Sequence, residues 1–328
     1  MNKIVLGGAA LLALLSLAAP VYAQGYPTRP IMMIVPFPAG GPSDTVARIT
    51  AEGMSRHLGQ SIIIENVGGA GGTLGASRAA GADPDGYTIM AVSMGAHVSA
   101  PVFYPNLRYD PRTDFEPVGL TANAPAAIAA KKDLPVNNLK EFIAYVKQHG
   151  ADVKQAHGGI GATSHMACLL FNTLFDLHPT LVAYRGTGPA VNDLIGGHVD
   201  YYCEQAVSIA PGAKGGLIKA LVVSGNERLA ALPDVPTAKE AGAPDFQLNV
   251  WSGVFAPKGT PKDVIAKLSE ALDKTLQEPG TGEKLAKLGG TVPGKAERGP
   301  EHLRKLVHDD MDRWAPILKS AAAENKPN

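Results

Sequence analysis

Short apolar runs alternate with segments whose apolar residues recur at helical spacing along most of this chain. The run Ile31 to Val35 predicts a first strand, and the segment after it predicts a helix that ends at Gly59. Other apolar runs predict further strands at 61–67, 87–92, 126–130, 153–156, 181–184, 199–203, 218–223 and 248–256. This alternation favours an α/β fold with mainly parallel sheets.

Residues that favour helix starts place several of the helices. Ser43 or Asp44 is expected to cap the first helix. Asn138 is expected to cap a helix over 139–149, and Thr260 a long helix that has proline at its first position. Further helices are expected at 73–82, 166–174, 189–195 and 301–324.

The order of strand, glycine-rich turn, hydroxyl residue and helix occurs once near the start of the chain and again after residue 124. This repetition predicts two lobes, the first made of residues 24–122 and 250–328 and the second of residues 123–249. Two crossings, near 120–125 and 247–252, join the lobes and allow hinge closure.

The segment Pro36 to Asp44 connects the first strand to the first helix. Gly40 and Gly41 lack a Cβ, so their backbone can adopt positive φ and approach a bound group closely. The first N–H groups of the helix have no internal partner, and a carboxylate or phosphate placed there needs no lysine. A similar turn covers 158–165, so the two turns could face one another across a cleft. Ordinary strand-to-helix turns, with glycines for geometry alone, are the alternative.

Residues 1–23 have the pattern of a cleaved signal peptide, with one cation, an apolar stretch and a small-residue cleavage site. Removing Lys3 from 30 basic and 30 acidic residues leaves 29 against 30, a formal charge of −1. Such a balance gives no reason to expect a nucleic-acid or anionic-membrane partner. The two cysteines, Cys168 and Cys203, lie in the exported part, where they either form a disulfide or stay as buried thiols.

Eight segments in order along the mature chain resemble the periplasmic solute-binding proteins of tripartite tricarboxylate transporters, often called Bug-type receptors. The segments are 36–44, 65–75, 83–88, 109–111, 159–165, 184–186, 193–197 and 251–261. The resemblance implies a two-lobed periplasmic binding protein fold of type II, with two strands crossing between the lobes. It also implies a periplasmic monomer, without enzymatic activity, metal or cofactor, that captures a small organic acid and meets membrane permease subunits.

The resemblance also implies where the acid is held. Backbone amides and ordered waters near the first loop hold one carboxylate, here at Phe37, Ala39, Gly40 and Ser43. The far end of the acid meets the second loop, here at Gly161, Ala162, Thr163 and Ser164.

The chain departs from the common family pattern in two places. Ala162-Thr163 stands where Gly-Ser is frequent, and Glu204 stands where an aspartate often follows the strand over 199–203. The longer carboxylate could shrink the pocket or select a hydroxyl or ammonium group, so the identity of the ligand does not carry over. The cysteine pair resembles one found in a subset of the family, which favours the disulfide.

Five further residues complete the candidate ligand-binding set. Ser93 and His97 follow a strand end, His165 opens a helix and Asp44 closes the first loop. Arg185 could complement a ligand charge, with surface exposure or an ion pair as the alternative. For Ser93 the other reading is a helix cap, and for His165 it is packing at a helix start.

Three other kinds of site fit the sequence less well. A dinucleotide fingerprint is broken by Leu74, and no Gly-Lys-Ser or Gly-Lys-Thr is present. A nucleophile elbow around Ser93 is broken by Ala91, and the pair Ser164-His165 does not define a triad. His157 and His165 do not have the spacing of a metal motif.

The sequence therefore predicts a receptor that captures a small mono- or dicarboxylate and delivers it to a tripartite tricarboxylate transporter. The alternative within binding is a sensory co-receptor whose closed form engages the receptor kinase of a two-component system. A periplasmic serine hydrolase is the less favoured alternative.

Overall fold

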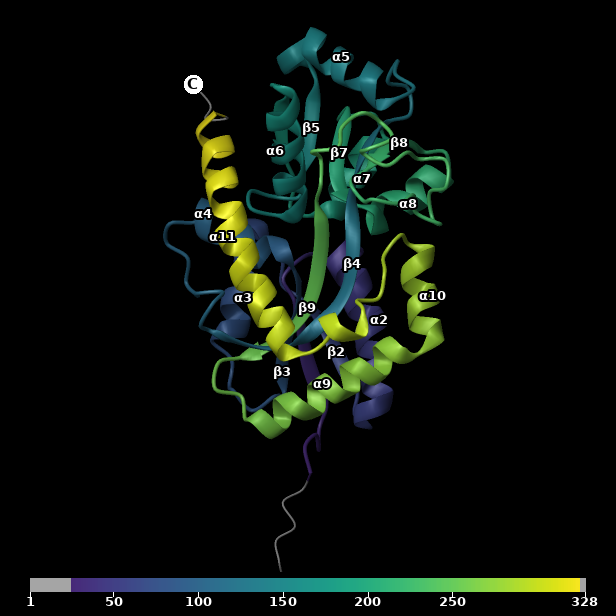
Figure 1. The fold of residues 1–328 in the computed structure, drawn as a ribbon. Helices are drawn as coiled ribbons and strands as arrows, with labels where there is room; N and C mark the ends of the chain where they lie inside the picture. Colours follow the sequence, from purple (N-terminus) through teal and green to yellow (C-terminus); the bar gives the residue numbers. More distant parts are fainter. Residues whose placement is uncertain (1–24, 325–328) are drawn as a thin grey trace, which may run out of the picture.

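The computed structural model describes residues 25–324, so the predicted signal peptide lies outside the described residues. One mixed sheet forms the centre of the molecule, in the order β2-β1-β3-β9-β4-β7-β5-β6, with β8 also paired to β4. Its strands are β1 Ile31–Val35, β2 Ile62–Asn66, β3 Thr88–Ser93, β4 Phe115–Lys131, β5 Lys154–His157, β6 Thr180–Ala183, β7 Tyr201–Gln205, β8 Ile218–Val223 and β9 Asn249–Pro257. Figure 1 shows the long strands β4 and β9 running through the middle of the fold.

Strand β4 divides the sheet into two lobes because its two parts have different partners. From Phe115 to Pro125 it pairs with β9, which in turn pairs with β3. From Ala126 to Lys131 it lies between β7 and β8. The sequence predicted only the second part of this strand. The first part contains two prolines and two register shifts against β9, and these hide its alternating pattern.

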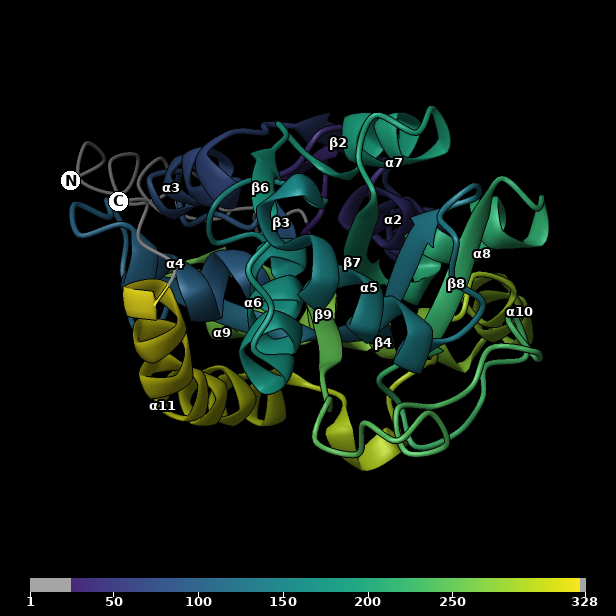
Figure 2. The ribbon, with the colours of Figure 1, turned by 90° about the horizontal axis from the view of Figure 1, so that it is seen from above.

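Helices cover both faces of each part of the sheet (Figure 2). The helices are α2 Pro42–Leu58, α3 Thr73–Ala80, α4 Ala100–Phe103, α5 Leu139–His149, α6 Thr163–Phe175, α7 Thr187–Ile195, α8 Ala206–Lys214, α9 Lys262–Gln277, α10 Pro279–Lys287 and α11 Pro300–Glu324. The sequence missed α4, α8 and α10. Helix α4 has a proline in its first turn, α8 contains Pro211 followed by Gly212, and α10 begins with Pro279 and contains two glycines. Within residues 25–324 no helix is long and apolar enough to cross a membrane.

The alternating side chains of β1 hold the first lobe together. Ile31 and Met33 belong to the apolar cluster that α2 and α9 cover, whereas Ile34 belongs to the cluster that α3 and α11 cover. Full burial of one such side chain stabilises the fold by about 1.5–3 kcal/mol. Helix α11 also contacts α6, so the last helix lies against both lobes.

Side chains along β7 point alternately to the two faces of the sheet in the second lobe. Tyr201 and Cys203 face α6, and Tyr202 belongs to the cluster that α7 and α8 cover. A disulfide joins Cys203 to Cys168 of α6 across a Cα–Cα distance of 5.2 Å, which confirms the predicted pairing. The next residue, Glu204, therefore points away from α6 and toward the start of α7.

Two of the predicted helix caps are wrong. Helix α2 begins at Pro42, so Ser43 and Asp44 lie inside its first turn. The capping position is occupied by Gly41, which has no side chain to accept from the first N–H groups. Thr260 donates its hydroxyl to the carbonyl of Pro257 at 2.8 Å and does not cap α9. Asn138 is confirmed as a cap, because its side-chain oxygen accepts from the N–H of Glu141 at 2.9 Å.

His97 lies in the apolar core of the first lobe and not at its surface. A π-helical turn over Gly95–Ser99 follows β3 and directs the imidazole toward Phe115, Phe255 and Trp251. The ring is fully buried, and neither nitrogen has a hydrogen-bond partner. This burial lowers the pKa of His97 from 6.5 to about 3.

Removal of the disulfide is expected to destabilise the fold. The double variant Cys168→Ala/Cys203→Ala should lose roughly 3 kcal/mol of unfolding free energy, because the bridge closes a long loop in the unfolded chain. The loss can be measured by urea denaturation. Dithiothreitol should lower the urea midpoint of the wild type to about that of the double variant. It should leave the midpoint of the double variant unchanged. Equal midpoints for oxidised wild type and double variant would contradict the expectation.

Acid should destabilise the protein partly through His97. Its folded pKa is depressed, so the unfolded state binds more protons below pH 6.5 and stability falls as the pH drops from 6.5 toward 3. The contribution amounts to about 2 kcal/mol at pH 5. His97→Met should therefore lose less stability than the wild type between pH 7.5 and pH 5, as measured by urea denaturation at each pH.

The control for that comparison is His178→Gln, which removes an exposed histidine. Identical pH dependences for His97→Met and the wild type would show that the buried imidazole does not act in this way.

Candidate ligand-binding site

Four helices begin at one place between the lobes. Helix α2 comes from the first lobe, and α6, α7 and α8 come from the second, each following a strand end. Their first turns or capping residues, Gly41, Ala162, Gly186 and Gln205, line a common cavity. The first N–H groups of each helix have no internal partner and carry the positive end of its dipole. The cavity is therefore suited to an anion.

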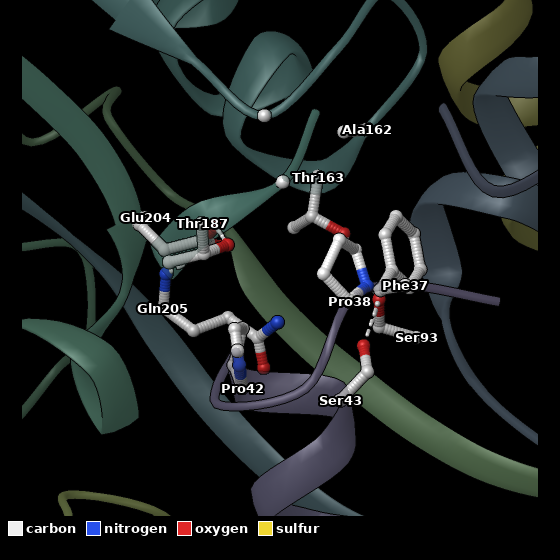
Figure 3. Close-up of a pocket in the computed structure, with 13 residues that line it drawn as sticks. Phe37, Pro38, Pro42, Ser43, Ser93, Ala162, Thr163, Thr187, Glu204 and Gln205 are labelled. Carbon is white, nitrogen blue, oxygen red and sulfur yellow. Dashed lines mark hydrogen bonds between the residues drawn. The ribbon is translucent and has the colours of Figure 1, made fainter. Parts of the chain in front are cut away.

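The cavity itself is small in this closed arrangement (Figure 3). It encloses about 10 Å³, which is room for roughly one water molecule. The residues that line it are Phe37, Pro38, Gly41, Pro42, Ser43, Ser93, Gly158, Ala162, Thr163, Gly186, Thr187, Glu204 and Gln205.

A chain of three hydroxyl groups crosses the cavity from one lobe to the other. Ser43 Oγ donates to Ser93 Oγ at 3.2 Å, and Ser93 Oγ is 3.2 Å from Thr163 Oγ1, with either oxygen able to donate. Among the described residues, the hydrogen-bond partners of the Ser93 hydroxyl are therefore hydroxyl groups and not a histidine base. This arrangement lacks the activated nucleophile that a serine hydrolase needs.

Other direct contacts hold the lobes together beside the cavity. Tyr104 donates its hydroxyl to the carbonyl of Ile160 at 2.8 Å, and Ser99 donates to the carbonyl of Gly161. Gly95 is so close to the second lobe that a Cβ there would lie 2.7 Å from the backbone nitrogen of Thr163. The structure therefore represents a closed form in which the two lobes touch.

Glu204 is the one charged side chain among the described residues that line the cavity. Its carboxylate accepts three hydrogen bonds, from Thr187 Oγ1 at 2.7 Å, the Tyr202 hydroxyl at 2.9 Å and the backbone N–H of Gln205 at 2.9 Å. Burial raises the pKa of Glu204, and these three hydrogen bonds act against that rise. Within the described part of the chain, Glu204 forms no ion pair with a Lys, Arg or His.

Gln205 lies beside Glu204 and was missed from the sequence. It is 2% exposed, and its amide nitrogen has no hydrogen-bond partner although it is buried. In Figure 3 its side chain points from the end of β7 toward the centre of the cavity. A buried donor without a partner costs free energy, so this amide is suited to an acceptor supplied by a ligand.

Six of the sequence-predicted residues line the cavity, namely Phe37, Ser43, Ser93, Ala162, Thr163 and Glu204. Their contact with a ligand stays a prediction. Besides Gln205, the sequence missed Thr187, although the glycine before it marks the start of a helix as Gly41 does. That glycine, Gly186, has a φ of 139°, which favours glycine.

Most of the other predicted residues have partners within the protein. The N–H of Gly40 donates to Asp44 Oδ2 at 2.9 Å, and Arg48 Nε donates to the same oxygen at 2.9 Å. Ser164 Oγ accepts from the N–H of Gly158 at 2.9 Å. These contacts shape the two loops, and among the residues described neither Asp44 nor Ser164 lines the cavity.

Four predicted residues lie further from the cavity, and Ala39 lies in the first loop without lining it. His97 is in the core, and His165 packs against Phe103 and His157, where burial lowers the pKa of His165 to about 3. The carbonyl of Gly161 accepts from Ser99, and Arg185 lines a separate groove together with Ile160. No cluster of three potential metal ligands occurs in residues 25–324.

The chain matches the model of the tripartite tricarboxylate transporter family receptor over residues 46–322. Among solved structures, MatC of Rhodopseudomonas palustris with bound malate is 43% identical, with a TM-score of 0.86 and coverage of 89% of this chain and 100% of that one. The periplasmic binding protein BugD is 41% identical, with a TM-score of 0.87 and coverage of 90% and 99%. Rpa4515 of R. palustris with adipate is 32% identical, with a TM-score of 0.86 and coverage of 90% and 98%.

These similarities confirm both the two-lobed, type II periplasmic binding protein fold and the Bug-type resemblance. The relatives are solute-binding proteins and not enzymes, in agreement with a cavity formed by helix starts and hydroxyl groups. The chain belongs to the tripartite tricarboxylate transporter receptor family.

Proposed function

We propose that this protein is a periplasmic receptor that captures a small organic carboxylate between its lobes and delivers it to the permease of a tripartite tricarboxylate-type transporter. The convergence of four helix starts on one interlobe cavity is the observation that carries this proposal. Relatives with malate and with adipate show that members of the family hold such acids. The predicted signal peptide and the disulfide support export to an oxidising compartment.

Capture requires the lobes to separate. An acid of four carbons is larger than the one water molecule that the closed cavity can hold, so entry of the acid needs an open form. We infer that the two predicted lobes move against one another. The hinge then lies where the paired strands β4 and β9 pass from one lobe to the other. Asn123 pairs with Trp251 there, and Pro125 pairs with Asn249.

Closure gives the bound acid its affinity. Water is excluded as the lobes meet, so the helix dipoles and amide donors act on the carboxylate in a medium of lower dielectric constant. The closed form also presents a surface that includes both lobes, which lets a permease distinguish the loaded receptor from the open one. A monomer suffices for this mechanism, because both walls of the cavity come from one chain.

A thermal-shift screen of small mono-, di- and tricarboxylates tests the function. An acid at about 100 times its dissociation constant is expected to stabilise the native state by about 2.7 kcal/mol, because it binds only the folded protein. Uncharged sugars of similar size serve as controls and should give no shift. A folded protein whose melting temperature is raised by no carboxylate would contradict the proposal.

The closure mechanism can be tested with Gly95→Ala. The added methyl group meets the backbone of Thr163, and Gly95 has no positive φ, so the change hinders closure without backbone strain in the first lobe. We expect about tenfold weaker binding of the best acid from the screen, from the loss of interlobe contacts of the strength of the Ser93–Thr163 hydrogen bond. Small-angle X-ray scattering should show a smaller decrease in the radius of gyration on ligand addition than in the wild type.

The matched control is Gly280→Ala, which also adds a methyl group to a helical glycine but meets nothing within 4 Å. It should bind and compact like the wild type. If Gly95→Ala does the same, the lobes do not close as proposed.

A further inference from the structure

Glu204 and Gln205 place an acceptor and a donor side by side on the second-lobe wall of the cavity. Glu204 is 3% exposed and Gln205 is 2% exposed, and both line the cavity. Both lie at the end of β7, where Gln205 is also the capping residue of α8. The two side chains therefore contact the same ligand region.

The hydrogen bonds of Glu204 limit what it can still accept. An ionised carboxylate has about four acceptor positions. Thr187, Tyr202 and the N–H of Gln205 use three of them, which leaves one for a ligand. A ligand group with a single donor hydrogen matches that remaining position.

The free amide nitrogen of Gln205 adds a second requirement. It is a buried donor without a partner, so the ligand group beside it should also accept a hydrogen bond. A hydroxyl group both donates once and accepts, and it suits Gln205 whichever way the amide is turned. It is thus the simplest group that satisfies Glu204 and Gln205 together.

The other common substituents of small acids fit less well. An ammonium group has three donor hydrogens and no acceptor, so it finds one position on Glu204 and leaves the Gln205 nitrogen without a partner. A second ionised carboxylate can accept from Gln205 but is repelled by the charge of Glu204 at close range. A methylene group leaves both side chains unsatisfied.

We propose that Glu204 and Gln205 together select a hydroxyl substituent, so that the ligand of this receptor is a hydroxy acid. Its carboxylate is held by the helix starts, and its hydroxyl donates to Glu204 and accepts from the amide of Gln205. This inference rests on the proposed capture of a carboxylate in the interlobe cavity. It adds the chemical class of the ligand and the two residues that recognise it.

Isothermal titration calorimetry with malate, succinate and aspartate tests the inference on the mature wild-type protein. The three acids share a four-carbon diacid skeleton and differ at one carbon, which bears a hydroxyl, a hydrogen or an ammonium group. Malate is expected to bind at least about tenfold more tightly than each of the others, the range for a hydrogen bond to a charged group. Lactate with propionate, and citrate with tricarballylate, repeat the comparison on shorter and longer skeletons.

Two variants assign the selectivity to these residues. Gln205→Met keeps the length of the side chain and removes its donor, and Glu204→Gln keeps the shape and removes the charge. Each should reduce the preference for the hydroxy acid over its deoxy partner to less than about threefold, and Glu204→Gln should also strengthen succinate binding. Gln205→Asn, which withdraws the amide by one methylene group, replaces Gln205→Met if that variant does not fold. Gln148→Met, on the exposed side of α5, is the matched control and should keep the wild-type preference.

The possible failures are distinguishable. Equal affinities for every hydroxy acid and its deoxy partner would overturn the hydroxyl inference and leave carboxylate capture standing. Tighter binding of aspartate than of malate would overturn it in favour of an ammonium group. A preference for hydroxy acids that survives in both folded variants would show that other residues cause it. Absence of binding by any carboxylate would overturn the proposed function itself.

Discussion

The unpaired backbone N–H groups at the starts of four helices are the constraint on which this structure depends. A parallel strand that leads into a helix leaves these donors at the carboxyl edge of the sheet, where the same chain has no acceptor for them. One such helix in the first lobe faces three in the second. These helix starts direct positive partial charge at the cavity, and no cationic side chain lines it among the residues described. Affinity for an anion therefore follows from backbone geometry, and side chains are free to determine which anion.

Glu204 shows how a side chain can serve selectivity at the expense of raw attraction. A buried carboxylate weakens the attraction of the helix starts for an anion, and the loss of hydration on burial raises the pKa of Glu204. The protein retains it with three hydrogen bonds from Thr187, Tyr202 and Gln205. A site that needed only to bind negative charge would gain from an apolar residue here, so discrimination between ligands explains its presence better.

The sequence was sufficient for features that depend on neighbours along the chain. Strand β1 and the cap at Asn138 were predicted because their determinants lie within a few residues. Strand β4 was predicted only in part, since its first half is held by β9, which lies more than a hundred residues away in the chain. His97 was placed in the site because it follows a strand end, but a π-helical turn rotates it into the core. Gln205 has no local motif, and its importance is evident only once its amide is seen to lack a partner.

The disulfide occupies a position with a consequence beyond fold stability. It fastens Cys203 to α6, one residue before Glu204 and on the helix whose first turn contributes Thr163. The bridge thus fixes the cavity wall formed by the end of β7 and the start of α6, whereas without it that wall would have to become ordered when the lobes meet. The order of the cavity wall is in this way linked to the redox state of one pair of cysteines.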